Sequence, residues 1–307
     1  MKTWIGASEV AAIVGLHRFM SQFELWAKIH ELIPPKEGND QTRRGHIIEP
    51  ALRDWYAAHI GRPVVAGPAY QDQPFTRPDA PWQAARPDAS YLVNDGFRLV
   101  EIKTTNSWEH WGDDGTADVP PDYAVQVLWQ QWVCGGRGGF MLHGTDLIAF
   151  NRWNDEIRIY RIDVTPETQR LAARLAARVS RWWDAHVVKG APPEADGSDA
   201  TRDALRALYG RSDNGEMLDV TAELSTLVSR YRAAAEASDA ADAAKETARN
   251  QLVAAVGESA GVKGLCTYKA SKPRQSFNAE KFRKDHPELA AEYTVTGEPT
   301  RTLKLVK

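Results

Sequence analysis

The placement of the tryptophans constrains the fold more than any other feature of this sequence. All 11 tryptophans lie between Trp4 and Trp183, and none lies in the last 124 residues. Aromatic side chains dominate the energetics of protein cores. A large aromatic core can therefore be built only from about the first 190 of the 307 residues.

The composition excludes several classes of protein. Charged residues make up 26% and hydrophobic residues 43% of the chain, as in soluble globular proteins, and the net charge of −3 says nothing about partners. No apolar run approaches the ~20 residues of a membrane-spanning helix, and the N-terminus lacks the apolar core of a signal peptide. Cys134 and Cys266 lie far apart, and the eight histidines show no ligand spacing. We therefore expect a cytoplasmic protein without a disulfide framework, a zinc site or a membrane contact.

Pro and Gly in residues 189–198 predict a linker, after which the chain changes character. We predict a core domain over 1–190, an acidic helical arm over 191–262 and a basic tail over 263–307. Within the arm, Ala-rich helical spacing over 219–256 favours one long helix that packs as a hairpin or coiled coil. Residues 194–246 have a net charge of −6 and residues 263–307 one of +5. The tail, with strand patterns at 265–269 and 301–307, is either a solvated surface or a phosphate-contacting one.

The first domain opens with helix signals. Ser8 is positioned to cap a helix over 9–14, and Ser21 begins a capping box for a second helix. Apolar residues at helical spacing predict a third helix over 41–60, which Gly61 ends.

Strand patterns follow the third helix. Residues 90–93 and 97–103 flank the turn sequence Asn94-Asp95-Gly96 and predict a β-hairpin. Further helices are expected at 122–133 and 166–188, and further strands at 140–143, 147–150 and 157–162. This order predicts an α/β (α+β) fold in which helices flank one sheet. The glycine-rich segment 135–139 lacks the Lys-Ser/Thr of a phosphate loop and predicts a turn.

A group of charged residues on the predicted hairpin indicates a reactive site. Asp88 precedes the first strand, while Glu101 and Lys103 lie two residues apart on the second and so share a face. Pairing through the turn brings Asp88 close to Glu101, and the carbonyl of Ile102 remains available there. Two carboxylates and a carbonyl suit Mg²⁺ or Mn²⁺, and Lys103 can polarise a water molecule. This combination suits phosphodiester hydrolysis.

The alternative interpretation is a solvated strand, because an Asp followed by Glu-x-Lys is common there. Three features favour the site. Glu49 lies on an upstream helix next to Gly45, and Gln126 lies on the following helix with Gln130 one turn further. Residues 99–102 also form an apolar strand interrupted by one charge, which is costly to bury unless it is paired or binds a metal.

In their order and spacing these residues resemble the lambda-exonuclease or YqaJ-like viral recombinase branch of the PD-(D/E)xK nuclease superfamily. The resemblance covers roughly residues 5–165 and implies a restriction-endonuclease-like core with a central mixed sheet. The segments that carry it are 5–16, 23–26, 45–50, 87–88, 101–104 and 123–126.

The resemblance implies a role for each site residue. Asp88, Glu101 and the Ile102 carbonyl would hold Mg²⁺, with Mn²⁺ as a substitute. Glu49 would assist at that metal or at a second ion, and Lys103 would activate water.

For Gln126 the resemblance implies that it positions the water or Lys103, and for Ser8 a place near the bound 5′ end of DNA. The family's arginine for a 5′ phosphate has no counterpart upstream of Ser8, since counting back reaches Met1. The basic side chains that could serve instead are Lys2, Arg18, Arg43 and Arg86.

Together with the site residues, the resemblance implies a Mg²⁺-dependent exonuclease that digests linear double-stranded DNA from its ends, 5′ to 3′, for recombination. The resemblance also implies a trimeric ring and a single-strand annealing protein as partner. Two alternatives stay open: an endonuclease of the same fold, and a non-catalytic DNA-binding or assembly protein. The segments 108–111 and 129–132, rich in tryptophan, are expected in the core, with base stacking at a frayed DNA end as a second interpretation.

Overall fold

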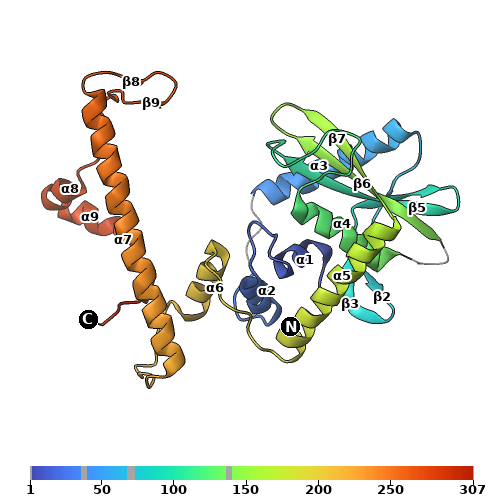
Figure 1. The fold of residues 1–307 in the computed structure, drawn as a ribbon, viewed down its shortest axis with the longest axis horizontal. Coiled ribbons are helices and arrows are strands. Elements are labelled where there is room, and N and C mark those ends of the chain that lie inside the picture. Colours follow the sequence, from blue (N-terminus) through green and yellow to red (C-terminus); the bar gives the residue numbers. More distant parts are fainter. Residues whose placement is uncertain (1, 36–39, 68–72, 136–139, 307) are drawn as a thin grey trace. The chain divides into compact units, whose positions relative to one another are not determined.

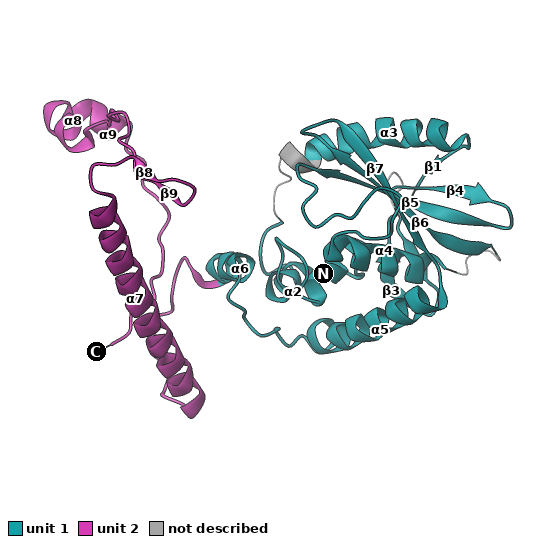
Figure 2. Cartoon of the chain, turned by 45° about the horizontal axis from the view of Figure 1, so that its top comes forward, with its two compact units in different colours: residues 1–208 teal, residues 209–307 magenta. Residues whose placement is uncertain are grey.

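The computed structural model describes residues 2–35, 40–67, 73–135 and 140–306. The chain forms two compact units, residues 1–208 and residues 209–307, which Figure 2 shows in teal and magenta. The predicted turn at 135–139 lies largely outside the described residues.

The first unit is built on a five-stranded mixed sheet in the order β1-β4-β5-β6-β7 (Figure 1). Strand β5 pairs antiparallel with β4 and parallel with β6, and β7 returns antiparallel to β6. The predicted α/β fold with a central mixed sheet between helices is thus confirmed. The strands are β1 (Val65–Ala66), β4 (Ala89–Val93), β5 (Gly96–Thr105), β6 (Met141–Asn151) and β7 (Glu156–Asp163).

Helices cover both faces of this sheet. In Figure 2, α3 (Asp40–Ile60) lies on one side, and α4 (Pro121–Cys134) and α5 (Pro166–Trp183) lie on the other. Alternate residues of β5 and β6 point to opposite faces, so that Val100 and Ile148 pack with α3 whereas Leu147 packs with α4. Burial on both faces explains why the middle of β5 is apolar apart from one charge.

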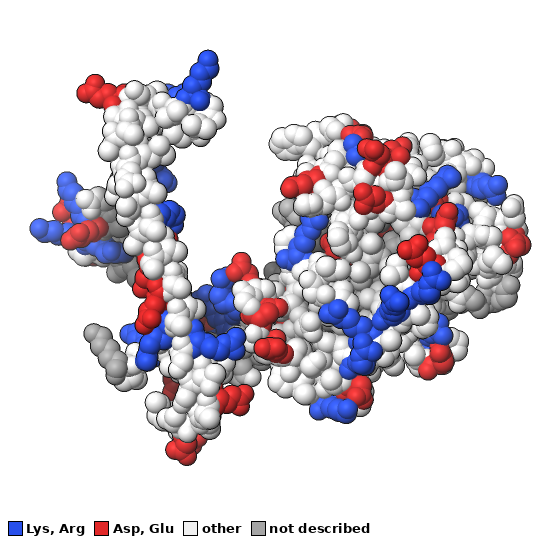
Figure 3. All heavy atoms as spheres, in the orientation of Figure 1, with Lys and Arg blue, Asp and Glu red and all other residues white. Residues whose placement is uncertain are grey.

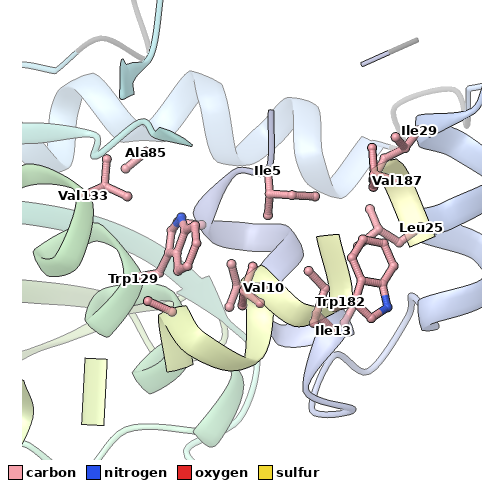
Figure 4. Close-up of a cluster of buried hydrophobic side chains, with 14 of the residues drawn as sticks. Ile5, Val10, Ile13, Leu25, Ile29, Ala85, Trp129, Val133, Trp182 and Val187 are labelled. Atoms are coloured by element: carbon pink, nitrogen blue, oxygen red, sulfur yellow. The ribbon is translucent and has the colours of Figure 1, made fainter. Parts of the chain in front are cut away.

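A second core joins the N-terminal helices to α4 and α5 (Figure 4). Helices α1 (Ala7–Ile13) and α2 (Gln22–Ile29) bury their apolar faces there, and the small hairpin of β2 (Phe75–Arg77) and β3 (Ala80–Ala85) packs beside them. Trp129 is fully buried at the centre, as expected from the sequence, and Trp182 is 6% exposed. Other side chains of this core are Ile5, Val10, Leu25, Val133 and Val187.

Two predictions about the first unit are corrected. Ser8 does not cap α1: Gly6 is the N-cap, and the carboxylate of Glu9 accepts a hydrogen bond from the Gly6 N–H at 2.9 Å. The segments 140–143 and 147–150 belong to one strand, β6, because buried Asp146 between them is fully hydrogen-bonded to neighbouring side chains and does not interrupt it. Ser21, by contrast, caps α2 as predicted.

The predicted helix over 166–188 forms as α5 followed by a π-helical turn, Asp184–Val188. Helix α6 (Asp199–Tyr209) comes after the predicted linker, and its segment up to residue 208 belongs to the first unit. Thr201 donates a hydrogen bond to Ser21 at 2.8 Å, and Ala204 is buried in the second core. The division between the units therefore lies after the linker.

The second unit is dominated by one long helix, α7 (Ala222–Val256), which forms within the predicted range 219–256 and has Thr221 as its N-cap. Short elements follow: β8 (Gly261–Val262), β9 (Cys266–Thr267), α8 (Ala279–Asp285) and α9 (Pro287–Glu292). The strand predicted over 301–307 does not form at 301–306, where the side chains are largely exposed and no neighbouring strand pairs with them. No helix in the described parts of the chain is long and apolar enough to cross a membrane.

Candidate active site

The β4–β5 hairpin brings Asp88 beside Glu101. Ala89 pairs with Val100, so the residue before it in the chain, Asp88, faces Glu101 at the point where β4 begins. The Ile102 N–H donates a hydrogen bond of 2.7 Å to Oδ2 of Asp88. The register that the turn sequence predicts therefore assembles the two carboxylates, as expected.

Gly67 fixes the backbone on the other side of Asp88. Its N–H donates to the carbonyl of Asp88 at 2.8 Å. A Cβ at this position would lie 2.0 Å from the carbonyl oxygen of Pro87. Only glycine allows this close approach of the two backbones. The local sequence around Gly67 does not reveal this contact, because Asp88 lies 21 positions further along the chain.

Glu101 is the centre of the site and is only 2% exposed. Its Oε1 accepts hydrogen bonds from Lys103 Nζ and Gln126 Nε2, both at 2.5 Å. Its Oε2 accepts a hydrogen bond of 2.6 Å from Nε2 of Gln130, which is fully buried. Three donors thus compensate a carboxylate that burial alone would destabilise.

Helix α4 supplies two of these donors from one face. Gln126 and Gln130 are four residues apart, so their side chains project in the same direction. The sequence pattern named Gln126 and, one turn further, Gln130, and the structure shows that both contact the same carboxylate. Gln126 donates to the Glu101 oxygen that also accepts from Lys103, and its implied role of positioning the water or Lys103 stays a prediction.

Lys103 shares the α4 face of β5 with Glu101. Its Nζ lies 5.2 Å from the centre of the Tyr123 ring. Burial on its own lowers the pKa of Lys103, but the charges of Glu101 and Asp88 and the hydrogen bond to Glu101 raise it above its ordinary value overall. Lys103 is therefore protonated at neutral pH, and its positive charge interacts with both carboxylates.

Negative charge is in excess around Asp88. Burial raises the pKa of Asp88 well above its usual range, and the charges of Glu101 and Glu49 raise it further, whereas Lys103 and the Ile102 N–H lower it. Glu49 reaches this cluster from α3, on the side opposite α4. Hard carboxylate oxygens that repel one another fit a divalent cation, which would compensate them.

The main-chain carbonyl of Ile102 completes the donor set. The N–H and C=O of one strand residue point to the same side, and the Ile102 N–H points to Asp88. The carbonyl of Ile102 therefore points to the same side of β5 as Asp88, next to the start of β4. Among the described residues no group of three or more His, Cys, Asp or Glu side chains forms a metal site, so a cation here would be held by two carboxylates and this carbonyl, with Glu49 nearby.

The predicted DNA-binding residues lie on different elements. Ser8 is exposed in the first turn of α1, and Arg43 is exposed on α3, six residues before Glu49. Arg18 lies 3.9 Å from Asp122 at the start of α4.

Arg86 and Lys2 do approach one another around Trp4. The guanidinium of Arg86 lies 5.2 Å from a ring centre of Trp4. The ammonium of Lys2 lies 3.9 Å from a ring centre of the same tryptophan. Lys2 also forms an ion pair with Glu9 at 2.7 Å. Both cations therefore contact the same tryptophan, and Arg86 is two residues from Asp88.

Comparison with known proteins finds a family model that matches part of the first unit. Residues 2–137 match the family described as "YqaJ-like viral recombinase domain", and this segment includes every predicted site residue. An uncharacterized protein of Bacillus subtilis, YqaJ, is 23% identical over 230 residues, which are 74% of this chain and 67% of that protein.

Solved structures also resemble the chain. An alkaline exonuclease from Laribacter hongkongensis is 24% identical, with a TM-score of 0.44 over 59% of this chain and 86% of that one. The complex of the LHK-Exo protein with dAMP is 21% identical, with a TM-score of 0.43 over 62% of this chain and 96% of that one.

Proposed function

We propose, because residues 2–137 match the family described as "YqaJ-like viral recombinase domain", that this protein is a metal-dependent deoxyribonuclease. The family match confirms the resemblance seen in the motifs. The observation that carries the proposal is the convergence of Asp88, Glu101 and Lys103 on the β4–β5 hairpin. Lys103 and two glutamines compensate Glu101, but the negative charge around Asp88 stays in excess, and a bound cation would offset it.

The site would hold Mg²⁺, or Mn²⁺ in its place, through Asp88, Glu101 and the Ile102 carbonyl. When bound, such an ion offsets charge on the transferring phosphoryl group and lowers the pKa of an attacking water. Lys103 would hold that water by hydrogen bonding. Glu49 would add negative charge on the α3 side, for the same ion or a second one.

Gln126 would act through Glu101. Its amide donates to the Oε1 atom that also accepts from Lys103. This contact holds the carboxylate in one rotamer and leaves the lone pairs of its oxygens directed away from α4 for a cation. A rigid ligand set matters because catalytic geometry tolerates displacements of only about half an ångström.

We further propose that the substrate is the end of linear double-stranded DNA, digested 5′ to 3′ during recombination. The family resemblance supports this substrate and polarity. It also supports a trimeric assembly and a single-strand annealing protein as partner. The order in which 5′ and 3′ labels are released from linear duplex tests the polarity, and light scattering of the purified protein tests the trimer.

The first experiment incubates end-labelled linear duplex with the purified protein, with and without Mg²⁺, each end type phosphorylated or not. We expect loss of linear duplex only with the metal, while closed circular DNA is spared. Cleavage of closed circles would instead favour an endonuclease of the same fold. DNA binding without metal-dependent cleavage would favour a non-catalytic DNA-binding or assembly protein.

The site assignment is tested by Lys103→Ala and Glu101→Ala. We expect each to lower the cleavage rate by a factor of at least about 100, with circular dichroism showing a folded protein. Lys189→Ala is the matched control, since Lys189 is an exposed lysine paired with Asp184 at 2.6 Å outside the site. Full activity in either site variant contradicts the assignment.

A further inference from the structure

The outer face of α5 carries four arginines that no part of the catalytic site uses. They are Arg170, Arg174, Arg178 and Arg181, named here the α5 arginine stripe, and all four are exposed. At 3.6 residues per turn they lie within an arc of about 80°, and at 1.5 Å per residue they extend over about 17 Å. Figure 3 shows a row of basic side chains over this helix.

The charge of the stripe is not balanced locally. Between Glu167 and Asp184 the sequence has no acidic residue. Within the described ranges, none of the four arginine side chains forms an ion pair or a hydrogen bond. Other exposed cations do: Arg202 pairs with Asp199 at 2.8 Å, and Arg249 with Glu246 at 3.0 Å.

The fold does not require this arrangement. The opposite face of α5 carries the packing, through buried residues such as Ala176, Val179 and Trp182. Like charges four residues apart on a helix repel each other, which costs a few tenths of a kcal/mol per pair. An unpaired row of like charges with no packing role is therefore explained best by a polyanionic ligand.

We propose that the α5 arginine stripe binds the phosphate backbone of double-stranded DNA, at a surface separate from the residues that would cut it. Guanidinium groups match phosphate oxygens with two parallel hydrogen bonds. Exposed Ala173 and Ala177 lie between the arginines, so small side chains leave room for a close approach. The inference rests on the proposed function only in taking DNA as the substrate.

The stripe belongs to the same compact unit as the catalytic cluster. Helix α5 packs on α4 through the core that contains Trp129 and Val179, and α4 carries the two glutamines that bind Glu101. DNA held by the stripe is therefore held by a surface whose position relative to the catalytic carboxylates is fixed by packing. Such a contact would retain the substrate between successive cleavages.

The test measures binding of a fluorescent 30-base-pair duplex by anisotropy in EDTA, over a series of salt concentrations. Each phosphate contact contributes about 0.9 to the slope of log K against log salt. Replacing all four arginines by glutamine should therefore reduce the slope by up to about 3.6 and weaken binding at low salt. Replacing all four by lysine should keep most of the slope, because the charge remains.

A matched variant removes four exposed cations that each have a carboxylate partner, and it should change the slope much less. These are Lys189, Arg202, Lys245 and Arg249. The paired variants R170Q/R174Q and R178Q/R181Q should each lose about half of the effect, and they keep the test valid if the fourfold variant unfolds.

Three outcomes would overturn the inference: an unchanged slope in the glutamine variant, an equal loss in the matched variant, or a change in oligomeric mass without a change in slope. The last result would mean that the stripe pairs with an acidic segment of a second copy. Failure of the proposed nuclease is distinct, because it would show as absent Mg²⁺-dependent cleavage while the slope effect in EDTA persists.

Discussion

At the scale of single residues, the site shows how one buried charge organises its surroundings. Glu101 sits in the middle of a strand covered on both faces, where an unpaired carboxylate would be expensive. Lys103 is the cation that compensates it, and two glutamine amides also donate hydrogen bonds to its oxygens. The Glu101 carboxylate can therefore be buried, because β5 supplies a cation and α4 supplies two hydrogen-bond donors to it.

Gln130 provides a residue-scale prediction. Gln130→Leu keeps the volume but removes the donor to Glu101 Oε2, so the carboxylate loses a constraint on its rotamer. We expect the cleavage rate to fall about 10- to 100-fold, as for residues that orient a metal ligand, and the Mg²⁺ concentration for half-maximal rate to rise. Initial rates on end-labelled duplex across a Mg²⁺ series measure both.

The neighbouring Gln131 is the matched control for Gln130. It is buried on the same helix, but its amide donates to the Ile162 carbonyl at 2.8 Å and does not contact Glu101. Gln131→Leu should lower the unfolding free energy by about 1–3 kcal/mol and leave the Mg²⁺ dependence unchanged. An equal shift of the Mg²⁺ dependence in both variants would show that Gln130 has only a structural role.

At the scale of elements, a buried polar network joins α3 to the sheet. Asp146 of β6 is fully buried, and its Oδ2 accepts hydrogen bonds from Tyr56 of α3 at 2.5 Å and from Tyr91 of β4 at 2.6 Å. Arg98 of β5 pairs with Oδ1 at 2.8 Å. Glu49 lies two turns before Tyr56 on the same helix, so this network helps to hold Glu49 at the site.

This network predicts a loss of stability in alkali. Burial, and then the Asp146 carboxylate, raise the pKa of Tyr91 to about 12 and that of Tyr56 still further. The folded protein therefore keeps phenol protons that the unfolded chain, with a pKa of about 10, has lost. Because the unfolded state binds fewer protons, the unfolding free energy should be constant up to about pH 10 and fall between about 10 and 12.

Urea unfolding followed by tryptophan fluorescence at pH 8, 9.5, 10.5 and 11 measures this decline. Tyr91→Phe should be less stable at pH 8 by about 1 kcal/mol, because one buried hydrogen bond is lost, and its decline above pH 10 should be shallower. The same pH dependence in Tyr91→Phe and in the parent protein would contradict the role assigned to this phenol.

At the scale of the whole molecule, the two units differ in how much core they contain. The first has continuous buried clusters on both faces of its sheet. Among the described residues of the second, Val256 is the single buried hydrophobic side chain. Stability scales with buried apolar surface, so the first unit should be much the more stable of the two.

Limited proteolysis tests this difference. The segment 211–221 is exposed and lacks helix or strand, so trypsin should cut after Arg211 and leave a resistant fragment that ends near this residue. Mass spectrometry of the early digest gives the cleavage site. Rapid digestion within 1–208, with survival of 222–256, would contradict this ranking of the two units.

The sequence by itself determined the elements that depend on local chemistry. Helices at 40–60 and 121–134 and the hairpin around Asn94 follow from apolar spacing, stop residues and turn propensity, which act within a few residues. Because hairpin register follows from its turn, the sequence also brought Asp88 to Glu101. The family model that matches residues 2–137 agrees with the resemblance that suggested the fold.

Only the tertiary structure decided what depends on contacts between distant segments. Gly67 and the Tyr56–Asp146 pair have no local signature, because their partners lie 21 and 90 positions away in the chain. Asp146 likewise lies within β6 and does not end it, because side chains from other elements donate hydrogen bonds to its buried carboxylate. Apolar spacing and turns act within a few residues, whereas the compensation of a buried charge depends on whichever groups the fold brings within about 3 Å of it.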